Sequence, residues 1–109
     1  NISPEWLEGE LFASGMFEQC VILGNDLDHC ALLCFAPAQI NSLKLEAAIE
    51  NVNANLPDYA KVKHWLRLPE PLSVQKAFWT ENGRPKREAI ASHFIAHFLE
   101  KQDGVYDVL

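Results

Sequence analysis

One short run of the sequence combines residue types that could bind an anion. Residues 80–87 read Thr-Glu-Asn-Gly-Arg-Pro-Lys-Arg, so Gly83 is followed at once by the cations Arg84, Lys86 and Arg87. A helical pattern begins directly after this run. Cations beside a helix start suit a phosphate or carboxylate, because the backbone donors and the helix dipole also favour negative charge there. The alternative is an ordinary Asn-Gly turn with solvated cations, since short basic runs are common.

A histidine pair offers weaker evidence of chemistry. His93 and His97 are four residues apart and could present two metal ligands on one face of a helix. Neither Glu88 nor Glu100 supplies a third ligand at a known spacing. The better interpretation is a histidine pair at the solvent edge of the helix.

The three cysteines do not form a recognisable site. Cys20, Cys30 and Cys34 each lie in an apolar run without a C-x-x-C spacing, which predicts buried, reduced thiols rather than disulfides or zinc ligands. His29 beside Cys30 resembles a base with its nucleophile. Adjacent residues of a strand point to opposite faces, so these two side chains do not pair. The sequence also lacks a Gly-rich phosphate loop, a G-x-S-x-G elbow and paired catalytic carboxylates.

Length and composition indicate one globular domain. The chain has 109 residues, of which 49% are hydrophobic and 22% charged, and it contains no apolar run long enough to cross a membrane. The formal net charge of −6 argues against a nucleic-acid binder. The chain begins without Met and without a signal-peptide pattern, and we expect it to be a piece of a longer cytoplasmic protein.

The charge is unevenly distributed along the chain. Residues 1–60 hold nine acids and only one base, Lys44, whereas two acids, Glu70 and Glu81, lie between residues 61 and 87. One half of the domain should therefore carry positive potential and could meet an anionic ligand or an acidic neighbour. Seven of the nine bases lie in this half: Lys61, Lys63, Arg67, Lys76, Arg84, Lys86 and Arg87.

The elements that must position the basic run can be read from the chain. Ser3 and Pro4 predict a helix start, as N-cap and first helical residue, and Gly15 predicts its end. In this helix Trp6 belongs to the predicted buried stripe, and Glu8 is predicted to point outward.

The middle and end of the chain predict strands and two further helices. Residues 17–23 and 29–35 predict neighbouring antiparallel strands, and residues 62–68 a third strand. A helix capped by Asn41 or Ser42 is predicted to extend to residue 56, and a further helix is predicted from residue 86 to residue 101. We therefore predict an α+β fold, with a small sheet of about three strands flanked by helices.

Two stretches carry no clear pattern. Residues 72–80 are ambiguous, although Phe78 and Trp79 at their end are apolar enough to hold the basic run on the core. The tail after Gly104 predicts no element.

Four segments in order resemble the C-terminal domain of the adenylate-forming superfamily, the AMP-forming acyl-CoA synthetases. Residues 1–8 resemble the family's I-S-P-x-x-[IV]-E segment after the interdomain hinge, and residues 80–87 its T-x-x-G-K-x-x-R loop. Residues 18–24 are similar to its E-x-A-V-V-x-G strand, and residues 55–59 to its L-x-x-Y segment. Residues 19–24 and 53–59 look most like the long-chain fatty acid branch of the family. The resemblance covers nearly the whole chain.

This resemblance implies that residues 1–109 are the C-terminal lid domain of a larger AMP-forming ligase, whose N-terminal adenylation domain is its partner. ATP with Mg2+ would activate a carboxylic acid, expected to be a long-chain fatty acid, as an acyl-adenylate with release of pyrophosphate. The lid would then rotate, and coenzyme A would attack the adenylate to give a thioester and AMP. The isolated chain is expected to have no turnover, because most of the acyl and ATP site lies in the other domain.

The resemblance also implies roles for individual residues. Arg84 stands where the family has its catalytic lysine, after Gly83 of the nucleotide-binding loop. Arginine keeps the charge but is planar and differently aimed, so Lys86, two residues on, is the second candidate for the adenylation cation. Arg87 matches the family's trailing arginine and is expected to be structural.

The rest of the basic half leaves two interpretations open. Lys61, Lys63 and Arg67 have the charge that the coenzyme A nucleotide would need. The other interpretation is a non-catalytic α+β module that binds an anionic ligand or partner through its basic half.

Overall fold

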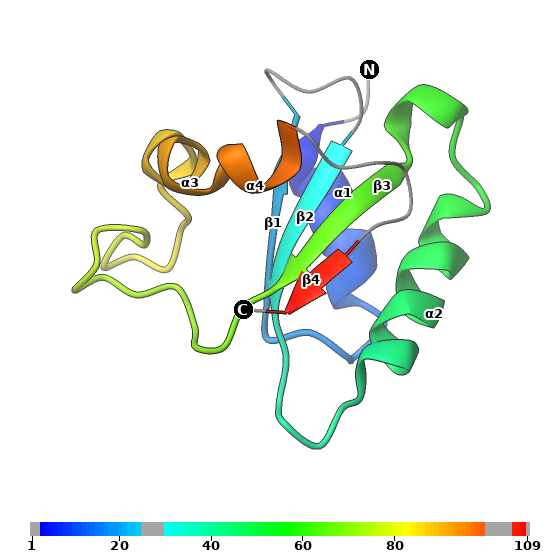
Figure 1. Ribbon diagram of the computed structural model, residues 1–109, viewed down its shortest axis with the longest axis horizontal. Helices are drawn as coiled ribbons and strands as arrows, with labels where there is room; N and C mark the ends of the chain where they lie inside the picture. The colour runs from blue at the N-terminus through cyan, green and yellow to red at the C-terminus, as the bar shows by residue number, and fades with distance from the viewer. Residues whose placement is uncertain (1–2, 25–29, 100–105, 109) are drawn as a thin grey trace.

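A mixed sheet of four strands lies at the centre of the molecule (Figure 1), in a computed structural model that describes residues 3–24, 30–99 and 106–108. The strands stand in the order β1-β2-β3-β4. In chain order the elements are α1 (Pro4–Phe12), β1 (Gln19–Leu23), β2 (Cys30–Phe35), α2 (Ser42–Asn53), the 3-10 turn η1 (Asp58–Ala60), β3 (Val62–Arg67), α3 (Arg87–Phe94), α4 (Ala96–Leu99) and β4 (Tyr106–Val108).

The register of the sheet confirms the predicted neighbouring strands. β1 and β2 are antiparallel, with Gln19 opposite Phe35 and Leu23 opposite Ala31. β2 and β3 are parallel, and α2 supplies the crossover connection that a parallel pair needs. The α+β class is therefore confirmed, with a short fourth strand added beside β3.

Both faces of the sheet are buried. The buried side chains on one face, such as Leu32, pack against α1 and α2 (Figure 1). Those on the other face, such as Leu33, pack against α3, α4 and the segment after β3. Strands that are covered on both faces lack polar alternation. This explains why β1 and β2 read as nearly continuous apolar runs in the sequence.

The two long helices start where their capping residues predict. The Ser3 hydroxyl accepts a hydrogen bond from the Trp6 amide at 3.1 Å, with Pro4 in the first turn of α1. The Asn41 side chain accepts from the Lys44 amide at 3.0 Å at the start of α2. These caps satisfy backbone donors that the helices leave unpaired.

The last helix, the tail and Trp6 differ from the sequence predictions. The last helix is split at Ile95, where the Phe98 amide donates to the Ile95 carbonyl at 3.0 Å in a tight turn, and the predicted end at residues 100–101 lies outside the described residues. The tail contains β4, whose three residues form a strand by pairing with β3. Trp6 is 50% exposed rather than part of the buried stripe of α1. Within the described residues, no helix is long and apolar enough to span a membrane.

Candidate functional site

Residues 80–87 form a tight hairpin with local hydrogen bonds. The Thr80 amide donates to the Arg84 carbonyl at 2.7 Å, and the Arg84 amide donates to the Thr80 hydroxyl at 3.0 Å. The Lys86 amide donates to the Phe78 carbonyl at 2.9 Å. The turn closes with a 3.0 Å bond from the Gly83 amide to the Thr80 carbonyl. Gly83 has a φ of +85°, a backbone conformation that glycine adopts at little cost. The turn therefore requires glycine at this position because of its backbone conformation.

The hairpin presents its two candidate cations to solvent. The side chains of Arg84 and Lys86 are exposed, and the described part of the chain places no carboxylate within 4 Å of either. Lys86 is also the N-cap residue of α3, so its charge stands at the start of that helix. Two solvent-exposed cations on a rigid turn can meet a phosphate or carboxylate without first breaking an internal ion pair.

An aromatic cluster joins the base of the hairpin to the core, as the apolar Phe78-Trp79 pair predicted. The Phe78 ring lies 5.2 Å from the His93 ring and 5.7 Å from the Phe94 ring, measured between centroids. His93 is exposed but contacts the Phe94 ring at 4.7 Å. The predicted solvent-edge position of His93 is confirmed, whereas the side chain of His97 lies outside the described residues. The described residues contain no group of three potential metal ligands.

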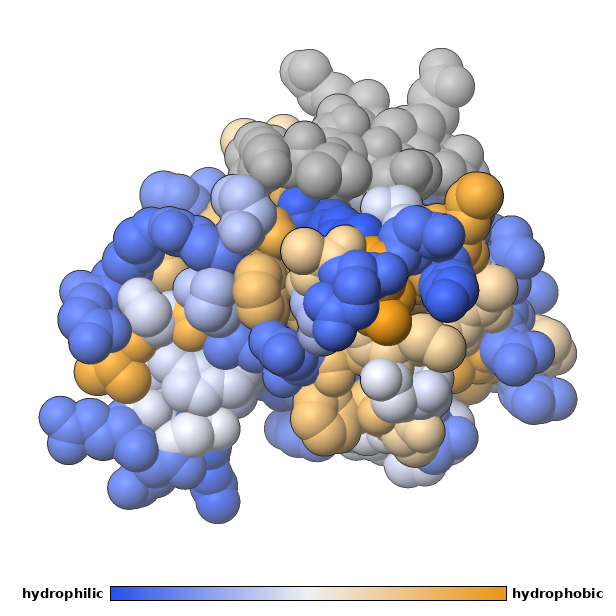
Figure 2. Space-filling view, turned by 90° about the horizontal axis from the view of Figure 1, so that it is seen from below, coloured by the Kyte–Doolittle hydropathy of each residue, from blue (hydrophilic) through white to orange (hydrophobic). Residues whose placement is uncertain are grey.

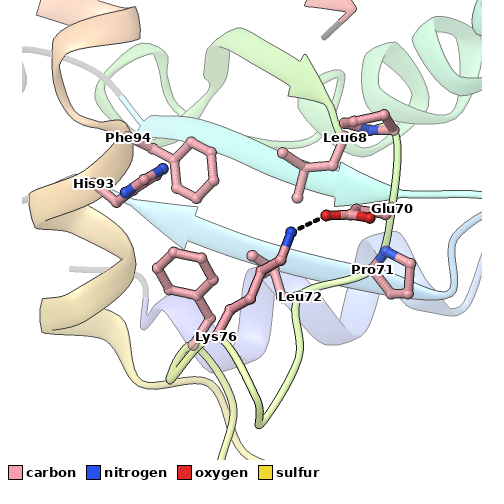
Figure 3. A pocket seen from close by; sticks show the side chains of 9 residues that line it. Leu68, Glu70, Pro71, Leu72, Lys76, His93 and Phe94 are labelled. Atoms are coloured by element: carbon pink, nitrogen blue, oxygen red, sulfur yellow. Dashed lines mark hydrogen bonds and ion pairs between the residues drawn. The ribbon is translucent and has the colours of Figure 1, made fainter.

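A pocket of about 580 Å³ opens beside this aromatic cluster (Figure 3). Its walls come from the segment after β3 and from α3, and an ion pair between Lys76 and Glu70 crosses its mouth. Both charged side chains are more than half exposed, so this pair contributes little to stability. The lining residues are Leu68, Pro69, Glu70, Pro71, Leu72, Lys76, Phe78, His93 and Phe94.

Arg87 makes the best-formed ion pair of the described residues. Its guanidinium contacts both carboxylate oxygens of Glu8, at 2.6 and 2.7 Å, and donates to the Ile22 carbonyl at 3.2 Å. The Glu8 carboxylate also accepts from the Ile22 amide at 2.7 Å. The hydrogen bond with Glu8 raises the pKa of Arg87, against the opposing effect of burial. The prediction that Glu8 points outward is wrong, because its carboxylate is tied to the edge of β1 and is only 14% exposed.

Sequence reasoning also missed two side-chain amides that bind the backbone of another segment. The amide of Gln19 donates to the Leu72 carbonyl at 3.0 Å and accepts from the Leu72 amide at 2.7 Å. The amide of Asn53 makes the same pair of contacts with Val62, both at 2.9 Å. No sequence signal marks these residues, because each partner is chosen by the packing of distant segments.

The remaining predicted ligand residues do not join the hairpin. Lys63 pairs with Asp58 at 3.0 Å. Arg67 donates to the Ser42 hydroxyl and to the carbonyls of Pro37 and Ile40, so its guanidinium holds the start of α2.

The three predicted nucleotide ligands therefore lie at different ends of β3. Lys61 and Lys63 lie at its start, and Arg67 lies at its end. At about 3.3 Å per residue, Lys61 and Arg67 lie roughly 20 Å apart along the strand. The chain leaves towards the hairpin from the Arg67 end. The nucleotide-binding role of Lys61, Lys63 and Arg67 stays a prediction.

The prediction of buried, free thiols is confirmed for Cys20 and Cys34, whereas Cys30 is free but only half-buried. All three are free, and Cys20 lies opposite Cys34 in the β1–β2 register. Burial raises the pKa of Cys34 to about 12 and raises that of Cys20 as well. Cys30 is half-buried, and burial raises its pKa too. Burial therefore disfavours the thiolate, the reactive form of these cysteines.

The comparisons with known proteins give one clear result, at the level of the fold. No protein-family model matches the chain, and no curated protein matches its sequence. Among solved structures, the A-PCP didomain of carboxylic acid reductase from Segniliparus rugosus in complex with AMP matches with a TM-score of 0.74 and 11% identity. The match covers 88% of this chain and 15% of that one.

Two further solved structures agree. The adenylation domain of a carboxylate reductase from Mycobacterium chelonae matches with a TM-score of 0.74 and 14% identity. The A domain of the Segniliparus rugosus enzyme, in complex with AMP and a co-purified carboxylic acid, matches with a TM-score of 0.73 and 11% identity. Each match covers 88% of this chain and 17% of the other. The chain therefore has the fold of a small part of these adenylation domains.

Proposed function

We propose that this chain is the C-terminal lid domain of an adenylate-forming enzyme that activates a carboxylic acid with ATP. The observation that carries the proposal is the exposed hairpin with Arg84 and Lys86, on a fold shared with part of AMP-bound adenylation domains. In the proposed first step, a carboxylate oxygen attacks the α-phosphorus of ATP, the bond to the β-phosphate breaks, and pyrophosphate leaves. Arg84 stabilises the negative charge that develops on the phosphate oxygens, with Lys86 as the second candidate.

The finer proposal is an acyl-CoA synthetase of the long-chain fatty acid type. In its second step the thiol sulfur of coenzyme A attacks the acyl carbonyl, the thiol loses its proton, and AMP leaves. Four sequence segments that resemble the acyl-CoA synthetases support this choice. Lys61 and Lys63, which lie at the opposite end of β3 from the hairpin, are proposed to face the coenzyme A nucleotide. A lid that rotates between two faces excludes water from the labile adenylate and then admits the thiol.

The missing parts of the site are assigned to the N-terminal domain of the same protein, located in the cytoplasm. ATP with Mg2+ would lie mainly on that domain, because the described residues offer exposed cations for phosphate but no cluster of carboxylates for the metal. The acyl pocket is placed there as well. The lid would contribute the cation and the water-excluding surface.

The experiment is carboxylate-dependent exchange of pyrophosphate into ATP by the full-length protein. Acids of increasing chain length would be compared for wild type, Arg84→Ala, Lys86→Ala and a control, Lys44→Ala, an exposed residue of α2. We expect exchange to rise with fatty acids and to fall roughly 100-fold in Arg84→Ala, the typical cost of removing one transition-state donor. Lys44→Ala should match wild type.

A non-catalytic module that binds an anionic partner is the second candidate. The observation that favours it is the arginine in the position where the resemblance expects the catalytic lysine. No exchange with any acid would support this module. Exchange that survives both Arg84→Ala and Lys86→Ala would remove the hairpin from the first step.

A further inference from the structure

The hairpin is the tip of a longer loop. The residues at both ends of this loop contact the edge strand β1. We define the basic arm as residues 73–86, which connect Leu72 to Arg87 and project away from the sheet on the β1 side (Figure 1). In the view from below the arm forms part of the left-hand lobe, whose surface is mostly hydrophilic with a smaller hydrophobic patch (Figure 2). β1 is the first strand of the sheet, so one of its edges has no strand partner among the described strands.

The first contact between β1 and the arm is made by the side-chain amide of Gln19. Its oxygen and nitrogen bind the backbone N–H and C=O of Leu72 at 2.7 and 3.0 Å, as a neighbouring strand would. Leu72 is itself buried at 6% exposure, so the arm leaves the core from a point that is held by both packing and hydrogen bonds.

The second contact lies three residues further along β1. The backbone N–H of Ile22 donates to Glu8, and its C=O accepts from Arg87, while the two side chains form a bidentate pair. Arg87 directly follows Lys86, so one candidate cation is one residue from this contact. Bidentate arginine–carboxylate pairs fix geometry as well as adding energy.

Between the two contacts the arm is held by local bonds and by apolar packing. Its hydrogen bonds join Thr80 to Gly83 and Arg84, and Phe78 to Lys86, and the solvent-exposed ion pair of Lys76 with Glu70 is a further contact with the segment before Leu72. The aromatic contacts of Phe78 with α3 are apolar and largely non-directional. We therefore expect the hydrogen bonds at its two ends to contribute most to the direction in which the arm projects, because exposed ion pairs contribute little.

We infer that Gln19 and the Glu8–Arg87 pair are positioning residues, which hold the basic arm on the edge of β1 so that Arg84 and Lys86 meet the phosphates in a fixed orientation. This inference rests on the proposed adenylation. A shift of about 1 Å in such a group can cost roughly 100-fold in rate, so a looser arm should lower kcat even though both cations remain.

The chain contains a matched control for this idea. The side-chain amide of Asn53 hydrogen-bonds both the N–H and the C=O of Val62, at 2.9 Å each, as Gln19 does with Leu72. Asn53 lies on α2, outside the arm. Gln19→Met and Asn53→Leu each remove one such pair of hydrogen bonds while keeping a side chain of similar size. Both should lower stability to a similar degree, but only the first should release the arm.

The test uses the full-length protein with two readouts. Amide hydrogen exchange over residues 73–86 reports how firmly the arm is held, and pyrophosphate exchange gives kcat and KM. For Gln19→Met we expect roughly tenfold faster hydrogen exchange in the arm, since the lost pair of hydrogen bonds weakens the hold by about 1.4 kcal/mol. We expect kcat to fall between roughly 10-fold and 100-fold, with the KM for ATP within about twofold of wild type. Arg87→Lys keeps the positive charge but cannot form the bidentate contact with Glu8, so it should show the same pattern.

Each result has a definite meaning. Faster hydrogen exchange in the arm together with a lower kcat, both absent from Asn53→Leu, supports the inference. Unchanged hydrogen exchange in both arm variants overturns the claim that these residues hold the arm. A looser arm with normal kcat, in a protein whose Arg84→Ala variant is inactive, overturns the positioning role but leaves the proposed function standing. No pyrophosphate exchange in wild type refutes the proposed function itself, and the positioning role with it.

Discussion

At the scale of single residues, two arginines three positions apart have opposite environments. Arg84 is exposed on the hairpin, whereas Arg87 donates to Glu8 and to the Ile22 carbonyl. The free guanidinium can bind an external anion, and the paired one has its donors occupied within the domain. Because of this contrast, we propose that Arg84 acts in the adenylation step and that Arg87 stabilises the folded domain.

We predict that Arg87→Met destabilises the domain by about 2 kcal/mol, because it leaves the poorly exposed Glu8 carboxylate without its charged partner. The pKa of Arg87 is raised in the folded state, so its contribution is fully present below the ordinary arginine pKa and is lost only as the pH rises beyond it. The effect should therefore be constant across neutral pH.

Urea denaturation at several pH values would measure this free energy of unfolding. Lys76→Met serves as the control, because the pair of Lys76 with Glu70 is solvent-exposed and should contribute less than about 1 kcal/mol. Equal losses in the two variants would show that the partial burial of the Glu8–Arg87 pair adds nothing.

At the scale of elements, the edge strand β1 is covered by side chains rather than by another strand. Glu8 from α1, Arg87 from α3 and the amide of Gln19 bind its edge or the segment beside it. Unpaired edges invite pairing with other chains, and charged side chains are a common protection. In this domain the protecting residues also join α1, α3 and the basic arm to one strand.

The start of α1 gives a prediction at this scale. Ser3→Ala removes the hydroxyl that accepts the Trp6 amide at 3.1 Å, and it should lower the free energy of unfolding by about 1 kcal/mol. Ser92→Ala is the matched control, because Ser92 is exposed within α3 and alanine has the higher helix propensity. Thermal denaturation of both variants would measure the difference. A Ser3→Ala variant as stable as Ser92→Ala would show that the cap is dispensable.

At the scale of the whole molecule, one sheet separates two cores. Leu32 packs on the α1–α2 side and Leu33 on the α3–α4 side, and each has 0% of its surface exposed. A sheet with one solvated face would bury only alternate residues, so equal burial of neighbours distinguishes the two architectures.

We therefore predict that Leu32→Ala and Leu33→Ala each cost about 3 kcal/mol, since both leave a cavity in a closed core. Leu43→Ala should change the free energy of unfolding by less than about 0.5 kcal/mol, because Leu43 is 73% exposed. Chemical denaturation of the three variants would test this. A small cost for only one of the two core leucines would mean that its face is open.

Much of the fold could be predicted because its signals are local. Ser3 and Asn41 cap helices through bonds to residues three positions on, and apolar runs bounded by turn residues predict strands. Gly83 and the cations around it could likewise be identified as a turn with a candidate site. Such features depend on neighbours in sequence, so the sequence contains the information.

The errors concern contacts between distant segments. Glu8 was predicted to point outward because helical spacing places it off the apolar stripe, but its partners Ile22 and Arg87 are 14 and 79 residues away. The three-residue strand β4 exists through its pairing with β3, and no periodicity can be read from so short a segment.

Local sequence patterns are enough to predict most of the helices and strands, their caps, the turn at Gly83 and the cations that stand beside a helix start. Which cations are available depends on the fold, because Arg67 and Arg87 donate to acceptors within the domain, whereas among the described residues no carboxylate lies within 4 Å of Arg84. The physical reason is that a guanidinium's role depends on the acceptors that come within about 3 Å of it. Those acceptors lie on segments far apart in the chain, and only folding brings them together.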